Sequence, residues 1–582
     1  MKSLPAESIA GLHVVTTDLP MSSEDVGTRY GQVPEWLNRT HAQDGSCAPA
    51  VHMHHHWDLF KMRTHAGQST AGNVTEEGEA RAEAWRERVL PSFNSIGIES
   101  QLVSLAPQLS NTILYFNDDF FVTRPLALTD LTSPLFGTVF RLQSSLLVAA
   151  AATGAADKEG EWPSLNYANQ LLDARFGVRR RPYVQHFVKT YEKEILAEIA
   201  QIWPEELTES AEVRFRDGPA VGLAFLATHF VVERHREALL WSFLIARADS
   251  DASRAYSPAE RRAALAELTP AAENEKYRKR PASNPLRPQI LVPKPRRAPL
   301  YAPHAALVRA GLPTPRATAY TFSAHAGGYA YARLGGHTKW QNGEPVWVEP
   351  GKGQRWVPDR NWPVYDYDEE DESGDADEEE GAADKDKGMQ EEMEKEMDIE
   401  CALDVVECFG AEWVAPADGD GDVPVEEVFR RVAFERPRCG DCIIASLVGQ
   451  SGRRGLSAFL PPPPAEEDAR GKIHIPLSVE KTWENATYAD GLGGGGSRAR
   501  AVSLLQRYSY IIGDSPAELI TYTNSRHLNR RLGRLVAAIR KEEPAFVVLN
   551  DDTADRITDR EVVLIDSGPC CYRVVLSGAG LV

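Results

Sequence analysis

No stretch of this 582-residue sequence has the roughly 18 consecutive apolar residues that a membrane-spanning helix needs. The first residues, Met1 to Pro5, also lack the apolar core of about 7–15 residues that is typical of a secretory signal. Read literally, the sequence therefore predicts a cytosolic protein that has neither a signal nor an anchor.

Cysteine is scarce as well, and the small odd number excludes a scaffold that depends mainly on disulfides. Cys439 and Cys442 have the spacing of half a zinc site, but no second pair follows at the spacing that zinc requires. We therefore expect a disulfide or two buried thiols at this motif. The seven cysteines are Cys47, Cys401, Cys408, Cys439, Cys442, Cys570 and Cys571.

The negative charge of the chain is confined to one segment. The net charge is −20, but residues 366–400 hold 19 acidic residues and three lysines, which leaves about −4 for the rest. This composition predicts a disordered acidic insertion. It gives no reason to expect a cationic partner for the folded part.

Composition also divides the rest of the chain. Residues 10–260 and 401–555 are interpreted as folded, and their short apolar runs and helical stretches predict an α/β fold. Residues 261–365 are rich in Pro, Arg and Gly and are expected to be linker-like, while 556–582 form an atypical tail. The basic residues of 261–365 come without a nucleic-acid-binding motif, so we expect no nucleic-acid partner.

A near-repeat is the most informative feature. Four apolar residues followed by Asn-Asp-Asp occur at 113–119 and again at 546–552. In an α/β sheet such a run is a buried strand whose polar end emerges at the edge where ligands bind. Adjacent carboxylates there can hold a hard divalent cation and, through it, a diphosphate. The alternative is that each triplet only begins a turn, but two copies favour a functional site. The polar residues are Asn117, Asp118, Asp119, Asn550, Asp551 and Asp552.

The surroundings of the first copy resemble a known family. Residues 89–102, Val-Leu-Pro-Ser-Phe-Asn-Ser-Ile-Gly-Ile-Glu-Ser-Gln-Leu, and 114–121 are similar to the second signature block of the Stealth family of sugar-phosphate transferases. The next block is similar at 162–172, 181–186, 214–216 and 233–241, and 434–460 resembles the fungal xylosylphosphotransferase branch. The resemblance extends over roughly residues 10–250 and 400–555.

The resemblance implies a fold and a reaction. The fold would be a nucleotide-sugar-transferase-like sheet with flanking helices. The reaction would move a sugar 1-phosphate from a nucleotide-sugar donor to a hydroxyl of a glycan acceptor, which requires charge neutralisation and in-line positioning. Asp118 and Asp119 would hold a divalent metal (Mg²⁺ or Mn²⁺) or position the acceptor, and Asp551 and Asp552 would form a second carboxylate site.

Further site residues are expected on the same basis. Arg214 would clamp a phosphate, with a surface ion pair to Glu205 or Glu206 as the alternative. His186 would act as acid or base, with a packing role as the alternative. Candidate binders of sugar hydroxyls are Asn94, Glu99 and Asn169.

Parts of the family pattern are absent from this sequence. The family's first block is missing and the pattern fades after Asp552, so we expect the chain as written to be incomplete and inactive or nearly so. The resemblance implies a membrane anchor, absent here, and a place in the Golgi or the secretory-pathway lumen. Two other classes remain open: an ordinary glycosyltransferase with the same donor, and a non-catalytic glycan-binding or vestigial protein.

Three further motifs carry less weight. The histidine run from His52 to His56 looks like a metal cluster, but successive side chains of an extended chain alternate faces, so not all can converge on one ion. The segment that begins at Asp418 opens like a calcium loop, yet its positions 6 and 12 are then Val423 and Phe429, so the pattern fails. Glycosylation sequons at Asn38, Asn73 and Asn485 are short enough to arise by chance.

Overall fold

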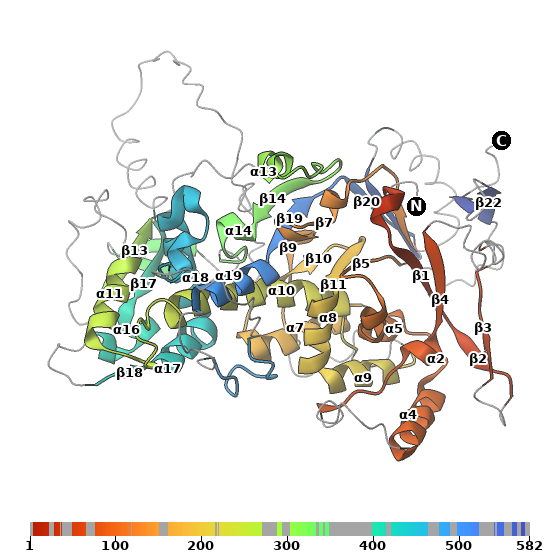
Figure 1. Cartoon of the computed structure of the whole chain (residues 1–582), viewed down its shortest axis with the longest axis horizontal. Coiled ribbons are helices and arrows are strands. Elements are labelled where there is room, and N and C mark those ends of the chain that lie inside the picture. The colour runs from red at the N-terminus through yellow and green to blue at the C-terminus, as the bar shows by residue number, and fades with distance from the viewer. Residues whose placement is uncertain are drawn as a thin grey trace, which may run out of the picture.

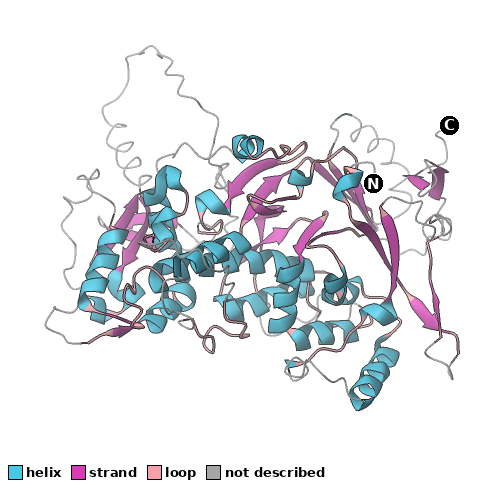
Figure 2. Ribbon diagram, in the orientation of Figure 1, coloured by secondary structure: helices cyan, strands magenta, loops and turns pink. Residues whose placement is uncertain are grey.

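The computed structural model shows an elongated molecule with a long helix near its middle (Figure 1). Helices and several small mixed sheets confirm the α/β class. Figure 2 shows most helices grouped below the strands and at one end of the molecule. The structure describes residues 4–22, 28–34, 37, 49–65, 76–117, 119–150, 161–215, 218, 220–269, 288–293, 303–332, 337–341, 344–348, 399–414, 421–463, 477–488, 497–522, 541, 544–551, 562–566 and 572–576.

The central helix α10 (Leu223–Leu240) is buried on nearly every side. It packs against α7 (Trp162–Phe176), α18 (Pro437–Ser451) and α19 (Ser497–Arg507), and its apolar residues belong to the largest hydrophobic core. Among the described helices, none combines the length and the apolar character needed to cross a membrane.

The charged side chains of α10 lie inside this core as ion pairs. Because an unpaired buried charge is costly, each one has a partner on another element, and removing one partner typically costs about 3–5 kcal/mol. The pairs are Arg181–Glu233 at 2.9 Å, Arg175–Glu237 at 2.8 Å, Arg234–Glu198 at 2.7 Å and Arg236–Asp441 at 2.7 Å.

A four-stranded sheet joins distant parts of the sequence in the order β14-β19-β8-β7. Its strands are β7 (Thr132–Ser133), β8 (Gly137–Phe140), β14 (Ala319–Ser323) and β19 (Tyr510–Asp514). The structure differs here from the expectation of a linker over 261–365, because β14 belongs to this sheet and Tyr329 and Tyr331 are buried. Aromatic residues of this Pro- and Arg-rich segment thus form part of the hydrophobic core.

Two smaller sheets hold the near-repeat. Strand β5 (Thr112–Tyr115) pairs antiparallel with β11 (Lys189–Glu192). Strand β21 (Phe546–Asp551) lies between β20 (Ala517–Tyr522), to which it is parallel, and β6 (Phe120–Val122), to which it is antiparallel.

The N-terminal strands form one end of the molecule (Figure 1). Strand β1 (Gly11–Thr16) pairs in parallel with β4 (Ala50–His55), and β2 (Asp18–Pro20) pairs with β3 (Arg29–Gly31). Helices α2 (His56–Leu59) and α4 (Glu76–Val89) follow, and their buried side chains share a core with Leu105 and Ala211.

The opposite end is mainly helical and contains two disulfides. Cys401 pairs with Cys442 and Cys408 pairs with Cys439, so α18 is linked to β17 (Ile399–Asp404) and α16 (Val405–Phe409). The expectation of a disulfide within the Cys-x-x-Cys motif, or of two buried thiols there, is therefore wrong, because Cys439 and Cys442 bond to separate upstream cysteines. One turn of α18 brings both thiols to the same neighbouring segment.

The remaining elements complete the two ends and the centre. The acidic segment lies outside the described residues up to 398, and its last two residues belong to β17. Other helices are α5 (Ser95–Ser100), α6 (Leu102–Leu105), α8 (Lys193–Ile202), α9 (Pro204–Glu212), α11 (Pro258–Leu268), α13 (Pro303–Arg309), α14 (Ala324–Gly327) and α17 (Val425–Arg430). Other strands are β9 (Leu142–Val148), β10 (Arg181–Val184), β12 (Ala255–Tyr256), β13 (Gln289–Pro293), β15 (His337–Gln341), β16 (Glu344–Val348), β18 (Val423–Pro424), β22 (Val562–Asp566) and β23 (Tyr572–Leu576).

Candidate active site

A cavity that is partly open to solvent lies where the first Asn-Asp-Asp triplet meets the loop between β10 and β11. Its wall combines apolar side chains with a few polar groups, which is the usual composition of a ligand site. Three of the predicted residues line it: Glu99, Asn117 and His186. The other lining residues are Ile96, Tyr115, Phe120, Glu161, Ser164, Leu165, Val184, Lys189, Gly222, Ala224 and Phe225.

His186 and Asp119 face each other at the edge of this cavity. Nε2 of His186 lies 3.3 Å from Oδ2 of Asp119, and about a quarter of each side chain is exposed. The edge of the imidazole also meets the ring of Phe120 at 4.9 Å between centroids. The carboxylate can hold the imidazole in one orientation and tautomer, as an acid or base requires.

The other carboxylate oxygen of Asp119 has a different environment. Oδ1 is buried and has no hydrogen-bond partner among the described residues. An unpartnered buried carboxylate oxygen is the kind of atom that a divalent cation or an acceptor hydroxyl would satisfy. Asp119 therefore fits the predicted metal role, while Asp118 lies outside the described residues.

A buried acid, Glu99, and a buried base, Lys189, also line the cavity. Oε1 of Glu99 accepts a hydrogen bond of 2.8 Å from the hydroxyl of Tyr191, and burial raises the pKa of Glu99 despite this bond. Burial lowers the pKa of Lys189 to about 8, although Glu99 and Glu161 act in the opposite direction. Nζ of Lys189 donates to the carbonyl of Gln185. This cation beside a cavity is suited to bind an anionic group.

The strand register brings the second triplet to the same end of the sheet. Val548 pairs with Phe120, which directly follows Asp119 in the sequence. Because β21 and β6 are antiparallel, Asn550 and Asp551 extend from this point toward the first triplet. The backbone thus directs the two triplets toward each other; the side chains of Asn550 and Asp551, and the whole of Asp552, lie outside the described residues.

Asn94 and Asn169, two of the predicted binders of sugar hydroxyls, do not line the cavity. Asn94 is fully buried, where its amide oxygen accepts from the backbone nitrogen of Ile96 and caps α5, and its amide nitrogen donates to the carbonyl of Val213. Asn169 is also fully buried, with Arg181, Asp173 and the Arg179 carbonyl as its partners. This geometry favours structural roles over the predicted sugar contacts, because the polar atoms of both amides are engaged inside the protein.

Arg214 is not among the residues that line the cavity. Its Nε donates to the carbonyl of Pro91 at 3.0 Å, and its own carbonyl accepts from the backbone nitrogen of Phe93. The alternative, an ion pair of Arg214 with Glu205 or Glu206, is not what the structure shows. Both carboxylates form ion pairs with Lys481 instead.

The sequence interpretation missed Lys189 and Glu161. Lys189 follows His186 by three residues on β11, and Glu161 precedes the Trp-Pro that begins α7. Both lie directly beside blocks that carried the family resemblance, and this position was the available signal. A single lysine or glutamate among many gives no chemical pattern of its own.

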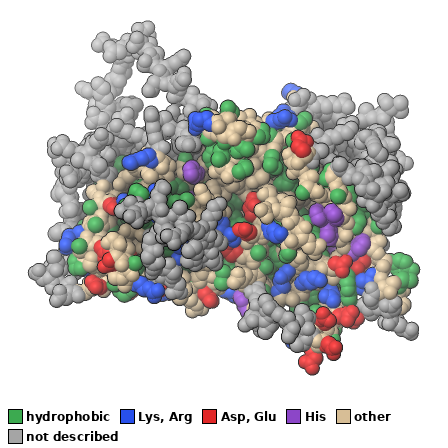
Figure 3. Space-filling view, viewed as in Figure 1, with side chains coloured by type: hydrophobic (Ala, Val, Ile, Leu, Met, Phe, Trp, Pro, Cys, Tyr) green, Lys and Arg blue, Asp and Glu red, His purple; other side chains and the backbone are tan. Residues whose placement is uncertain are grey.

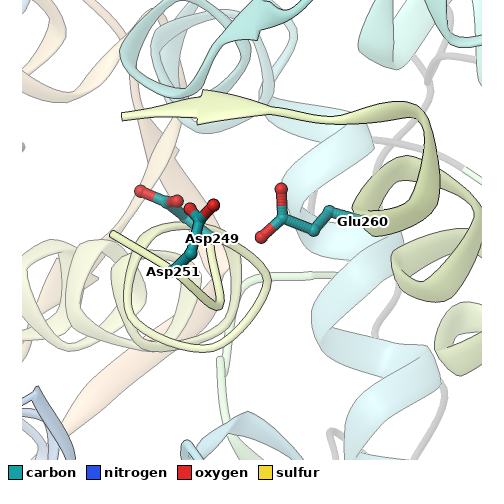
Figure 4. Close-up of side chains that lie close together, drawn as sticks. All are labelled: Asp249, Asp251 and Glu260. Carbon is teal, nitrogen blue, oxygen red and sulfur yellow. The ribbon is translucent and has the colours of Figure 1, made fainter. Parts of the chain in front are cut away.

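A second group of side chains that could hold a metal shares no residue with the cavity lining. Carboxylate oxygens of Asp249, Asp251 and Glu260 lie within 4.8 Å of one another (Figure 4). The spacing from 249 to 260, Asp-x-Asp-x-Ser-x-x-x-Ser-x-x-Glu, follows the twelve-residue calcium loop except that position 6 is Arg254 instead of glycine. Arg254 nevertheless has a φ of 68°, the conformation for which glycine is normally used at that turn. Carboxylate oxygens in this pattern suit calcium.

The strand pairing of this loop corrects the interpretation of the Asp418 segment. Tyr256, position 8 of the first loop, pairs with Val423. If Val423 is position 8 of a second loop, Gly421 becomes position 6 and Glu427 position 12, and both match the calcium pattern. Position 1 is then Pro416, which does not match it. Taking Asp418 as position 1 had set the alignment off by two residues. Residues 415–420 lie outside the described part of the chain.

Comparison with known proteins shows that part of the cavity lining lies in a segment shared with a protein family. Residues 185–233 match the model of "Stealth protein CR3, conserved region 3". This stretch contains His186, Lys189 and Arg214. The resemblance to Stealth proteins is confirmed.

Relatives of this Stealth-like chain carry related names. The chain is 28% identical over 533 residues to a "3-O-alpha-D-mannopyranosyl-alpha-D-mannopyranose xylosylphosphotransferase" of Cryptococcus neoformans var. grubii, covering 87% of this chain and 53% of the relative. It is 33% identical over 141 residues to an exopolysaccharide phosphotransferase of Mycobacterium leprae, covering 24% of this chain and 26% of the relative. The chain thus spans about half the length of the fungal relatives.

Proposed function

We propose that this Stealth-like chain transfers a sugar 1-phosphate from a nucleotide sugar to a hydroxyl of an acceptor glycan. The observation that carries the proposal is the cavity lined by His186 and Lys189, with Asp119 in contact with His186, within and beside the segment that matches conserved region 3. The names of the relatives, all phosphotransferases acting on saccharides, point in the same direction.

In the proposed reaction, the acceptor oxygen attacks the phosphorus that bears the sugar. The bond between the two phosphates of the donor breaks, a phosphodiester forms, and the nucleoside monophosphate leaves. His186, oriented by Asp119, would take the proton of the attacking hydroxyl. The ammonium of Lys189 would bind phosphate oxygens, and Glu99 would accept from a sugar hydroxyl at the cavity wall.

A divalent ion is part of the proposal. When bound, Mg²⁺ or Mn²⁺ would neutralise charge on the diphosphate. Asp119 would hold it through the buried Oδ1, with Asp118 and the second triplet as further ligands. We also propose that the sheet around the near-repeat is of nucleotide-sugar-transferase type, with the ligand at the strand ends that carry the triplets.

The Golgi or another part of the secretory lumen is the proposed location. Two disulfides, Cys401–Cys442 and Cys408–Cys439, support it, because structural disulfides persist in oxidising compartments and are rare in the cytosol.

Product analysis tests the function. The protein is incubated with a panel of nucleotide sugars, Mg²⁺ or Mn²⁺, and the mannose disaccharide named for the fungal relatives. A phosphodiester signal in the ³¹P spectrum of the product, with release of nucleoside monophosphate, is the expected result. A phosphorus-free product with release of nucleoside diphosphate would mean glycosyl transfer instead, and donor binding without turnover would mean a non-catalytic protein.

A further inference from the structure

Two phenylalanine rings stack on each other at the protein surface. The ring centroids of Phe93 and Phe215 lie 5.5 Å apart, with an angle of 13° between the ring planes. Both residues nevertheless stay largely exposed, at 64% and 55%. Hydrophobic side chains appear at many points of the face drawn in Figure 3, and single ones are ordinary. Parallel rings in contact at this separation are offset, so the pair still offers an apolar surface to a partner.

Hydrogen bonds fix the two loops that carry these rings. The backbone nitrogen of Phe93 donates to the carbonyl of Arg214 at 2.9 Å, and Nε of Arg214 donates to the carbonyl of Pro91 at 3.0 Å. The amide nitrogen of Asn94 donates to the carbonyl of Val213 at 2.9 Å. These bonds join the two loops next to the stacked rings. An aromatic pair that is held in this way loses little conformational entropy when a ligand covers it.

Both loops continue into the wall of the cavity. Ile96, which lines the cavity, follows Phe93 by three residues, and Gly222, which also lines it, follows Phe215 by seven. Three residues of extended chain span at most about 11 Å, so the Cα atoms of Phe93 and Ile96 are no farther apart than that. The stacked rings therefore lie within the reach of a ligand that extends out of the cavity by a few sugar units.

The chemistry of the pair fits a sugar ring. One face of a pyranose ring consists mainly of C–H groups, and the negative face of an aromatic ring attracts these weakly positive hydrogens. The phosphates of a donor need a cation instead, and Lys189 supplies one inside the cavity. A glycan acceptor continues beyond the hydroxyl that reacts, so its other rings leave the cavity and meet the surface around it.

We propose that Phe93 and Phe215 form a subsite for a sugar ring of the acceptor glycan, beyond the ring that carries the attacking hydroxyl. This inference rests on the proposed function, which makes a glycan the acceptor. The subsite selects acceptors by length. A glycan of several rings binds in the cavity and on the stacked pair, whereas a single sugar binds in the cavity alone.

Titration with a mannose trisaccharide in the absence of donor, followed by saturation-transfer NMR, tests the subsite without any need for turnover. F93A and F215A should each weaken binding by roughly 3–10-fold, the scale of losing one aromatic contact. F93Y and F215Y keep the ring and should retain the affinity. Y30A is the matched control, because Tyr30 on β3 is as exposed as Phe93, at 64%. Melting temperatures should change little, since all the altered side chains are exposed.

Kinetics separate the acceptor from the donor. In the turnover assay, F93A/F215A should raise KM for the trisaccharide by about tenfold or more at unchanged kcat, because the rings contribute binding alone. KM for methyl mannoside and for the donor should stay the same. If no protein turns over, the proposed function fails, and the titration still decides on the subsite.

Three results would overturn the proposal. The first is equal trisaccharide affinity, or none, in the unaltered protein and F93A/F215A. The second is an equal loss of affinity in Y30A, which would make the effect unspecific. The third is weaker binding of the nucleoside monophosphate, with unchanged binding of the trisaccharide, in F93A/F215A. That result would mean that the base of the donor stacks on these rings instead of a sugar.

Discussion

Nε2 of His186 faces Oδ2 of Asp119 at 3.3 Å, although the two residues are 67 positions apart in the sequence. Strand β11, which follows His186, pairs with β5, which precedes Asp119, and this pairing fixes the distance between them. An imidazole held in this way beside a carboxylate oxygen has its proton position defined before any substrate arrives.

The first prediction concerns this pair. Asp119→Asn and His186→Gln should each lower turnover of the proposed reaction by about 10²-fold or more, the usual effect of losing an acid–base group. Because the residues act together, the double variant should lose much less than the product of the two single losses. Initial rates with the four proteins measure this, and E194Q, at a largely exposed surface carboxylate, is the control. Strictly multiplicative losses would contradict joint action.

Donor binding should depend on pH through Lys189. Its pKa, lowered by burial to about 8, means that the ammonium is present below pH 8 and is lost above it. If the ammonium binds phosphate, affinity should be constant below pH 8 and then fall by up to about tenfold per pH unit. Calorimetric titration of a nucleotide sugar between pH 7 and pH 9.5 measures this.

Two replacements of Lys189 provide the comparison. Lys189→Met should bind the donor weakly at every pH, and Lys189→Arg should remove the decrease above pH 8, because guanidinium stays charged. If the donor affinity of Lys189→Met also falls above pH 8, a group other than Lys189 causes the pH dependence.

Calcium should stabilise the fold through the loop from Asp249 to Glu260. At a concentration of 100 times the dissociation constant, Ca²⁺ should add about 2.7 kcal/mol to the free energy of unfolding. Glu260→Gln should abolish the Ca²⁺-dependent rise in melting temperature. Glu267→Gln, on the same helix but at a half-exposed carboxylate paired with Arg247, should keep it. A rise that persists in Glu260→Gln would place the ion elsewhere.

Glycosylation tests the proposed location. Asn485 is exposed in the structure, so its sequon is accessible, while Asn38 and Asn73 lie outside the described residues. In native protein from a secretory-pathway host, glycosidase treatment should increase electrophoretic mobility, and Asn485→Gln should reduce that change. The absence of any change, with recovery in the cytosolic fraction, would exclude the lumen.

Much of the site was accessible from the sequence because its chemistry is local. An apolar run that ends in Asn-Asp-Asp predicts a strand end with carboxylates, and β5 and β21 have this form. The roles of Asn94 and Asn169 were not accessible, because an amide that caps a helix and one that binds a sugar look alike until its partners are known.

Long-range pairing accounts for the other differences. Cys439 and Cys442 resemble a local pair, and only the packing of α18 beside β17 and α16 reveals their partners. The alignment of the second calcium-type loop depends on which residue pairs with Tyr256. The histidine run could be divided into two faces by alternation, but His13, whose ring stacks on His52, comes from another strand.

Strand β16 ends at Val348 and strand β17 begins at Ile399, and these two strands lie against each other. Strand β17 is also paired with β13, and the disulfide Cys401–Cys442 links it to α18. The segment between them therefore leaves and re-enters the fold at neighbouring, anchored points. Closing a chain between fixed points costs only about 0.6 kcal/mol for each doubling of its length. Natural variants should consequently differ freely in length here, and the same position can accept a fluorescent domain or an affinity tag without disturbing the cavity.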